Sequence, residues 1–132
     1  MAAESDLSRI ISEFKTCFKK FDDIELFSHY RENILSLIKR IDHEIKDHCM
    51  KIIYNDHRIF IQFEKDFYII FKIRYEQKVD LAWCSDYERM MHYEIRFKKL
   101  EPKMKYTFKS IIRDDKWQDM LIAQLQLFFQ FK

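Results

Sequence analysis

The chain has 132 residues, a length typical of one domain, and 48% of them are hydrophobic and 17% aromatic. Each buried aromatic side chain removes roughly 150–250 Å² from water, so a core of this composition requires neither disulfides nor a metal. The net charge is only +2. Glycine is absent, and its absence excludes glycine-dependent phosphate loops, dinucleotide fingerprints and the G-x-S-x-G nucleophile elbow.

Two amphipathic helices are predicted at the start of the chain. Residues 6–21 and 24–48 place apolar side chains at helical spacing, and the second helix would be about 37 Å long. A cap at Ser5 or Asp6 begins the first helix, and Asp22 with Glu25 resembles a capping box before the second. The two apolar stripes are Leu7, Ile10, Ile11, Phe14, Phe18 and Phe21, then Phe27, Tyr30, Ile34, Leu37, Ile38, Ile41 and Ile45.

The apolar period then changes from that of a helix to that of a strand. The β-rich runs are residues 51–55, 58–63, 67–75 and 79–84, and two or three polar residues separate them. Gaps this short allow hairpins and exclude parallel crossovers, so we expect an antiparallel meander. Without glycine, the tight turns must use Asn or Asp, or longer loops.

The last third of the chain predicts two more strands and a helix. Residues 86–99 could be a helix, but the alternation over 91–99 favours a strand with Tyr93, Ile95 and Phe97 inward. His92, Glu94, Arg96 and Lys98 would then point outward, and Met104, Tyr106 and Phe108 of strand 103–109 would point inward. Asp114 or Asp115 caps a final helix, whose stripe is Trp117, Met120, Leu121, Leu125, Phe128 and Phe129.

These elements together predict a single α+β domain over residues 1–132. Two N-terminal helices precede an antiparallel β-meander of about five to six strands. A C-terminal helix packs on the sheet.

Basic residues are concentrated in the last strand pair. Residues 96–113 hold seven basic groups and only Glu101 against them. The candidate binding residues are Arg96, Lys98, Lys99, Lys103, Lys105 and Lys109. Like charges opposite one another across strands are destabilising, so fold stability does not require them. They either protect an exposed sheet edge or bind an anionic partner.

Two other patterns contain residue types that can carry chemistry. His92, Glu94 and Arg96 alternate along one strand and could cleave RNA without a metal, although charged alternation is also ordinary for a solvent-facing strand. The metal candidates match no known zinc spacing: His43, Asp47, His48, Cys49, Asp56 and His57. We therefore predict no catalytic residues, no metal and no cofactor.

The predicted function is that of a non-enzymatic protein-binding domain, such as an inhibitor, an immunity protein or an adaptor. Its expected partner is another protein, whose surface could be acidic, and self-association is left open. The alternatives are a nucleic-acid-binding protein using the basic strand pair and a metal-independent ribonuclease. Because Tyr106 and Phe108 are expected to face the core, they could not stack on bases, which weighs against nucleic acid.

Cysteine content and hydropathy indicate the compartment. Cys17, Cys49 and Cys84 form an odd, sparse set that suits free thiols in a reducing cytoplasm. No apolar run reaches transmembrane length, and the first ten residues lack the pattern of a signal peptide. We expect a soluble cytoplasmic protein with no membrane partner.

Overall fold

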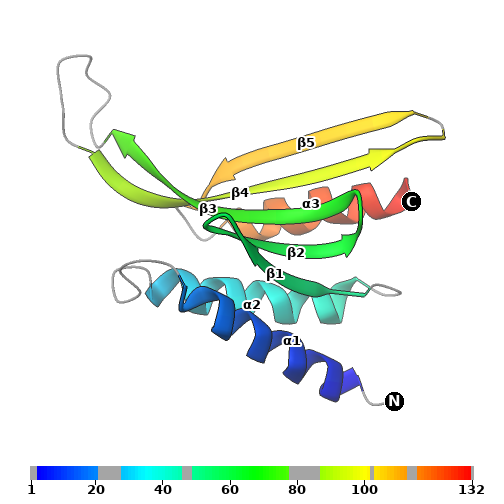
Figure 1. Ribbon diagram of the computed structural model, residues 1–132. Helices are drawn as coiled ribbons and strands as arrows, with labels where there is room; N and C mark the ends of the chain where they lie inside the picture. Colours follow the sequence, from blue (N-terminus) through cyan, green and yellow to red (C-terminus); the bar gives the residue numbers. More distant parts are fainter. Residues whose placement is uncertain are drawn as a thin grey trace.

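The computed structural model describes residues 3–20, 28–45, 49–77, 87–101, 103–112 and 116–131. In this part of the chain, three helices and a five-stranded antiparallel sheet form the predicted α+β fold (Figure 1). The elements are α1 (Ala3–Phe18), α2 (Ser28–Glu44), β1 (Lys51–Asn55), β2 (Arg58–Glu64), β3 (Phe67–Gln77), β4 (Tyr87–Lys99), β5 (Met104–Ile111) and α3 (Trp117–Gln130).

The strands follow one another in space in the order β1-β2-β3-β4-β5, and each neighbouring pair is antiparallel. The predicted meander is therefore confirmed. Residues 87–99 form a strand and not a helix, as their alternation favours. The strand predicted at 79–84, the capping box at Asp22 and the caps at Asp114 or Asp115 lie outside the described residues.

All three helices lie on one side of the sheet (Figure 1). The core forms between them and the strand residues that alternation assigns to that side, such as Ile69, Phe71 and Ile95, each 0% exposed. Helix α3 contributes Trp117, whose ring lies 6.5 Å from that of Phe71 and 5.8 Å from that of Tyr93. Burial of these apolar surfaces supplies the main driving force for the fold.

Two predicted core positions are wrong. Met120 was placed in the apolar stripe of α3 but is 49% exposed, because the helix turns Leu121, Ile122 and Leu125 to the sheet. Tyr106 is on the helix side of β5 but remains 37% exposed. Its ring stacks on Phe131 at 5.3 Å and leaves one side open, because β5 is the edge strand.

A two-residue turn joins β1 to β2. Asp56 and His57 have φ angles of 53° and 59°, the left-handed conformation that such hairpins require and that glycine usually supplies. In this glycine-free chain an aspartate and a histidine adopt it, as the sequence requires. The Nδ1 atom of His57 lies 3.3 Å from the hydroxyl of Tyr54, which helps to hold the turn.

None of the described helices is long and apolar enough to cross a membrane.

The two described cysteines differ in accessibility. Both are free thiols, but Cys17 is buried in the core and Cys49 is exposed. Burial raises the pKa of the Cys17 thiol, which reduces the thiolate that reacts with alkylating agents.

We expect iodoacetamide to modify Cys49 rapidly in the folded protein and Cys17 only after denaturation. Mass spectrometry of native and denatured samples without reductant measures this. Denatured protein should show all three cysteines modified, including Cys84. Two protected cysteines after denaturation would reveal a disulfide and contradict the prediction.

Candidate functional site

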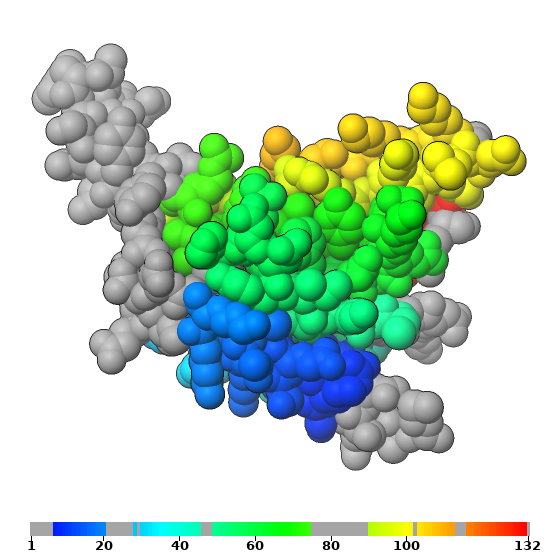
Figure 2. Space-filling model, in the orientation of Figure 1, coloured from blue at the N-terminus to red at the C-terminus, as the bar shows by residue number. Residues whose placement is uncertain are grey.

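The sheet surface turned away from the helices carries the candidate site, and we call it the open face. In Figure 2, side chains of β2, β3 and β4 (green to yellow) form the upper surface of the molecule, and none of the described helices lies over them in this view. The strand register arranges the open face in rows across the strands. These rows are Gln62–Tyr68–Arg96–Thr107, Ile53–Phe60–Ile70–Glu94–Lys109 and Asn55–Arg58–Lys72–His92–Ile111, with Lys98 opposite Lys105 at one end.

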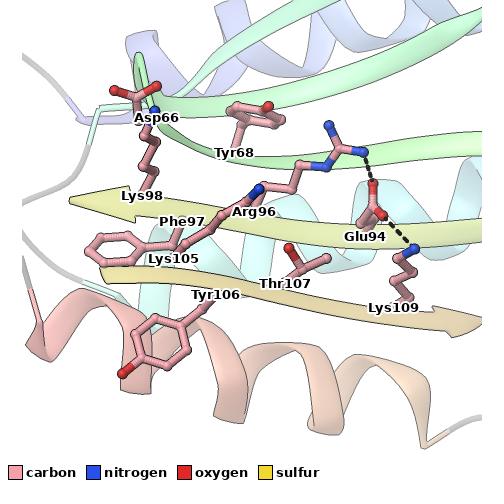
Figure 3. A pocket seen from close by; sticks show the side chains of 10 residues that line it. All are labelled: Asp66, Tyr68, Glu94, Arg96, Phe97, Lys98, Lys105, Tyr106, Thr107 and Lys109. Atoms are coloured by element: carbon pink, nitrogen blue, oxygen red, sulfur yellow. Dashed lines mark ion pairs between the residues drawn. The ribbon is translucent and has the colours of Figure 1, made fainter. Parts of the chain in front are cut away.

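A groove of about 400 Å³ lies on the open face over β3, β4 and β5 (Figure 3). We call it the basic groove. Its lining residues are Asp66, Tyr68, Glu94, Arg96, Phe97, Lys98, Lys105, Tyr106, Thr107 and Lys109, of which Phe97 and Tyr106 stack their rings on Phe128 at the helix side. Four of the six predicted binding residues line it. The hairpin of β4 and β5 brings them together, as predicted.

Glu94 has a different environment from the one predicted. It lies on the open face but is only 1% exposed, whereas the alternation predicted a solvated side chain. Arg96 Nη2 lies 2.9 Å from one carboxylate oxygen, and Lys109 Nζ lies 3.5 Å from the other (Figure 3). The long side chains of these cations cover the carboxylate, and Ile70 on the neighbouring strand is buried beside it.

Two predicted binding residues lie outside the basic groove. Lys99 turns to the helix side of the sheet, where its Nζ atom donates a hydrogen bond of 2.7 Å to the carbonyl oxygen of Phe131. A cation there complements the negative end of the α3 dipole, so Lys99 anchors that helix. Lys103 lies in the turn between β4 and β5, where it is exposed. Of the predicted binding residues, Lys99 therefore does not share the open face with Lys98, and Lys103 lies in the turn at the end of the strand pair.

Electrostatic surroundings keep Arg96 charged. A hydrogen bond with the Tyr68 side chain raises the pKa of Arg96 above its usual value, and the neighbouring Glu94 carboxylate adds to this effect. Burial lowers the pKa of Lys72, and the Glu94 carboxylate opposes that shift. Arg96 therefore remains a permanent cation in the groove.

Two aromatic side chains on the open face were not assigned to a site by the sequence. Phe60 on β2 and Tyr68 on β3 are partly exposed, and their rings lie 5.7 Å apart at an interplanar angle of 63°. They line a second hollow of about 260 Å³ together with Ile53, Asn55 and Gln62. Tyr68 lines both hollows, so the aromatic pair and the basic groove are continuous. In the sequence, alternation over 67–75 puts Tyr68 on the same face as Ile70, Lys72 and Arg74, a face that turns polar along its length, and this is the one signal that points to Tyr68.

The triplet considered for RNA cleavage does share the open face. His92, Glu94 and Arg96 follow one another along β4 on the same side. The Glu94 side chain is 2% exposed and is enclosed by Arg96 and Lys109, so a substrate hydroxyl has no direct path to its carboxylate. General base catalysis requires such contact within hydrogen-bonding distance.

We therefore expect the purified protein to cleave RNA no faster than a His92→Ala variant. Hydrolysis of a fluorogenic single-stranded RNA measures this, with a mock purification as background. Cleavage that exceeds the background and disappears in His92→Ala would support the ribonuclease hypothesis instead.

The residues considered for a metal site do not converge in the described part of the chain. No group of three or more His, Cys, Asp or Glu residues there is arranged to hold a metal ion. His43 is exposed in the last turn of α2, and Cys49 is exposed before β1. Asp47 and His48 lie outside the described residues.

Comparisons of this chain with protein-family models, with curated proteins and with solved structures give no match.

Proposed function

We propose that the protein is a non-enzymatic binding domain whose open face docks on an anionic partner. The observation that supports this most directly is the position of Arg96 and Lys98. Arg96 is paired with Tyr68 of β3 and Thr107 of β5, and Lys98 lies opposite Lys105 while its backbone N–H donates a hydrogen bond of 2.8 Å to the carbonyl oxygen of Asp66 beside β3, so neither residue lies on a free edge. Edge protection explains lysines on β5 but does not explain these two residues.

The arrangement of charge in the basic groove is consistent with this function. Lys98 lies directly opposite Lys105, an arrangement that destabilises a sheet slightly and that folding alone does not select. Arg96 and Lys109 are 45% and 69% exposed despite their pairing with Glu94, so both can still approach a ligand. Asp66 is the one other acidic lining residue. The groove therefore presents more positive than negative charge to solvent.

The class of protein follows from the sequence prediction. Inhibitors, immunity proteins and adaptors are small domains that act through such surfaces without chemistry of their own. Free thiols at Cys17 and Cys49 suit a reducing cytoplasm, which we infer as the compartment.

A charge-removal variant tests the proposal. We expect Lys98→Gln/Lys103→Gln/Lys105→Gln to leave stability unchanged or to raise it by a few tenths of a kcal/mol, because cross-strand repulsion is relieved. Binding to the anionic partner should weaken, and its dependence on salt should decrease, because exposed charges steer the encounter. The assay is a pull-down from extracts of the native source, with and without nuclease, quantified over a range of salt concentrations.

The matched control is Lys15→Gln/Lys19→Gln/Lys39→Gln, which removes three exposed lysines from the helix side. It has the same net charge as the test variant but an unchanged open face. If both variants lose the partner equally, overall charge and not the basic groove is responsible. If the test variant binds as well as the parent at low salt, the lysines serve only to protect the edge.

A further inference from the structure

The open face combines aromatic rings and cations in a single continuous surface. The hollow of Phe60 and Tyr68 meets the basic groove at Tyr68, and the register places Arg96 directly opposite Tyr68 on β4. Neighbouring strands are about 4.8 Å apart, so Lys105 and Thr107 on β5 lie about 10 Å from the aromatic strand β3. Along and across the strands, the same spacings put Lys105 about 12 Å from Tyr68 and about 20 Å from Phe60, so a ligand that contacts both rings and Lys105 must extend over several nucleotides.

On the same open face, cations also lie beyond the aromatic pair, at the end away from Lys98 and Lys105. Arg58 on β2 lies beside Lys72 on β3, one row beyond Phe60 and Ile70. Residues two apart on a strand are about 7 Å apart, so Arg58 and Lys72 are about 7 Å from the row of Phe60. A strand of alternating bases and phosphates that crosses the sheet would thus meet positive charge before and after the rings.

These features match the chemistry of single-stranded nucleic acid. Such ligands are held by aromatic side chains on which bases stack and by basic side chains that contact the phosphates. An open antiparallel sheet makes its exposed rings accessible to bases, because the side chains stand perpendicular to a nearly flat surface. The amide groups of Asn55 and Gln62 line the same hollow as the rings and supply hydrogen-bond donors and acceptors for base edges.

We propose that the open face binds single-stranded nucleic acid, with bases on Phe60 and Tyr68 and phosphates on Arg96, Lys98 and Lys105. This inference rests on one part of the proposed function, that the open face docks on an anionic partner, and it names that partner as nucleic acid in place of a protein. The objection from the sequence concerned Tyr106 and Phe108, which lie on the helix side of β5. It does not apply to Phe60 and Tyr68, which lie on the open face.

An acidic protein surface fits the observations less well. Carboxylates would satisfy the cations of the basic groove but would not stack on the parts of the Phe60 and Tyr68 rings that remain exposed beside their mutual contact. Duplex nucleic acid also fits less well, because its bases are stacked on one another and are not available to the rings.

Fluorescence anisotropy with labelled oligo-dT and oligo-rU of about twelve nucleotides tests the proposal, with a duplex of equal length for comparison. We expect Phe60→Leu and Tyr68→Leu each to weaken single-strand binding roughly ten-fold, because leucine keeps apolar volume but removes the stacking ring. Lys98→Gln/Lys105→Gln should reduce the log–log salt slope by about 1.4, or 0.7 for each phosphate contact. Lys15→Gln/Lys39→Gln should change neither quantity.

A second measurement does not depend on the folding of the variants. An NMR titration of the unmodified protein with oligo-dT should shift the amide signals around Phe60, Tyr68 and Arg96 and leave those of α1 and α2 unchanged. Shifts confined to the helices would overturn the proposal.

The outcomes separate this inference from the proposed function. Equal binding of duplex and single strand, or leucine variants that bind like the parent, would disprove base stacking. If no oligonucleotide binds while an acidic protein from the extract is lost in the lysine variant, the partner is a protein. The inference then fails and the proposed function stands. If neither ligand depends on Lys98 and Lys105, both fail.

Discussion

Replacing Phe71 with alanine is expected to lower the free energy of unfolding by about 3–5 kcal/mol. Phe71 is 0% exposed and lies in β3, the central strand of the sheet. Its ring faces Trp117 of α3 at an interplanar angle of 85°, and Tyr93 is its direct neighbour on β4. Truncation would leave a cavity between sheet and helix, which adds to the lost transfer free energy. Chemical denaturation monitored by circular dichroism measures the difference.

Phe60→Ala is the matched control for this substitution. Phe60 is also a strand phenylalanine, but it points to the open face and is partly exposed. Less apolar surface is lost there and solvent can fill the space, so we expect a cost of about 1 kcal/mol. Equal losses for the two variants would mean that the sheet does not have one covered and one open side.

Replacing Arg96 with methionine is expected to cost about 2 kcal/mol of stability. The Glu94 carboxylate is enclosed and depends on the guanidinium 2.9 Å away for its main charge partner. Methionine keeps much of the stem that covers Glu94 but removes the charge, so a buried carboxylate would lose a partner. Because Arg96 is itself 45% exposed, water can enter after the substitution. The expected loss is therefore below that for breaking a fully buried pair.

Lys109→Met separates this effect from a general loss of positive charge. Lys109 is 69% exposed and lies farther from the carboxylate, at 3.5 Å, so its replacement should cost less than about 1 kcal/mol. In a Glu94→Gln background the cost of Arg96→Met should shrink, and a double-mutant cycle measures that coupling. If Arg96→Met costs no more than Lys109→Met in the parent, Glu94 does not depend on Arg96.

The order of elements and the side of each strand that faces the core could be predicted from the sequence. Both depend on local periods: side chains repeat every 3.6 residues in a helix and every two in a strand. Alternation over 67–75 puts Ile69 and Phe71 on one apolar face, which is the core face of β3, just as it assigns Tyr93, Ile95 and Phe97 to the core face of β4. Short polar separators left a meander as the natural connection. The hairpin that brings Lys98 opposite Lys105 follows from the same reasoning.

The tertiary structure decided which side chains meet across strands and which of them water reaches. The burial of Glu94 depends on two cations from β4 and β5 that fold over it, and alternation alone describes such a residue as solvated. Lys99 differs from Lys98 only by one position, but that step turns it toward the carbonyl of Phe131 at the end of α3. Phe60 and Tyr68 become neighbours only through the register of β2 on β3, which includes an irregularity between Gln62 and Glu64. Cross-strand register and side-chain cover are properties of the assembled sheet, so a one-dimensional pattern determines the faces but not the site.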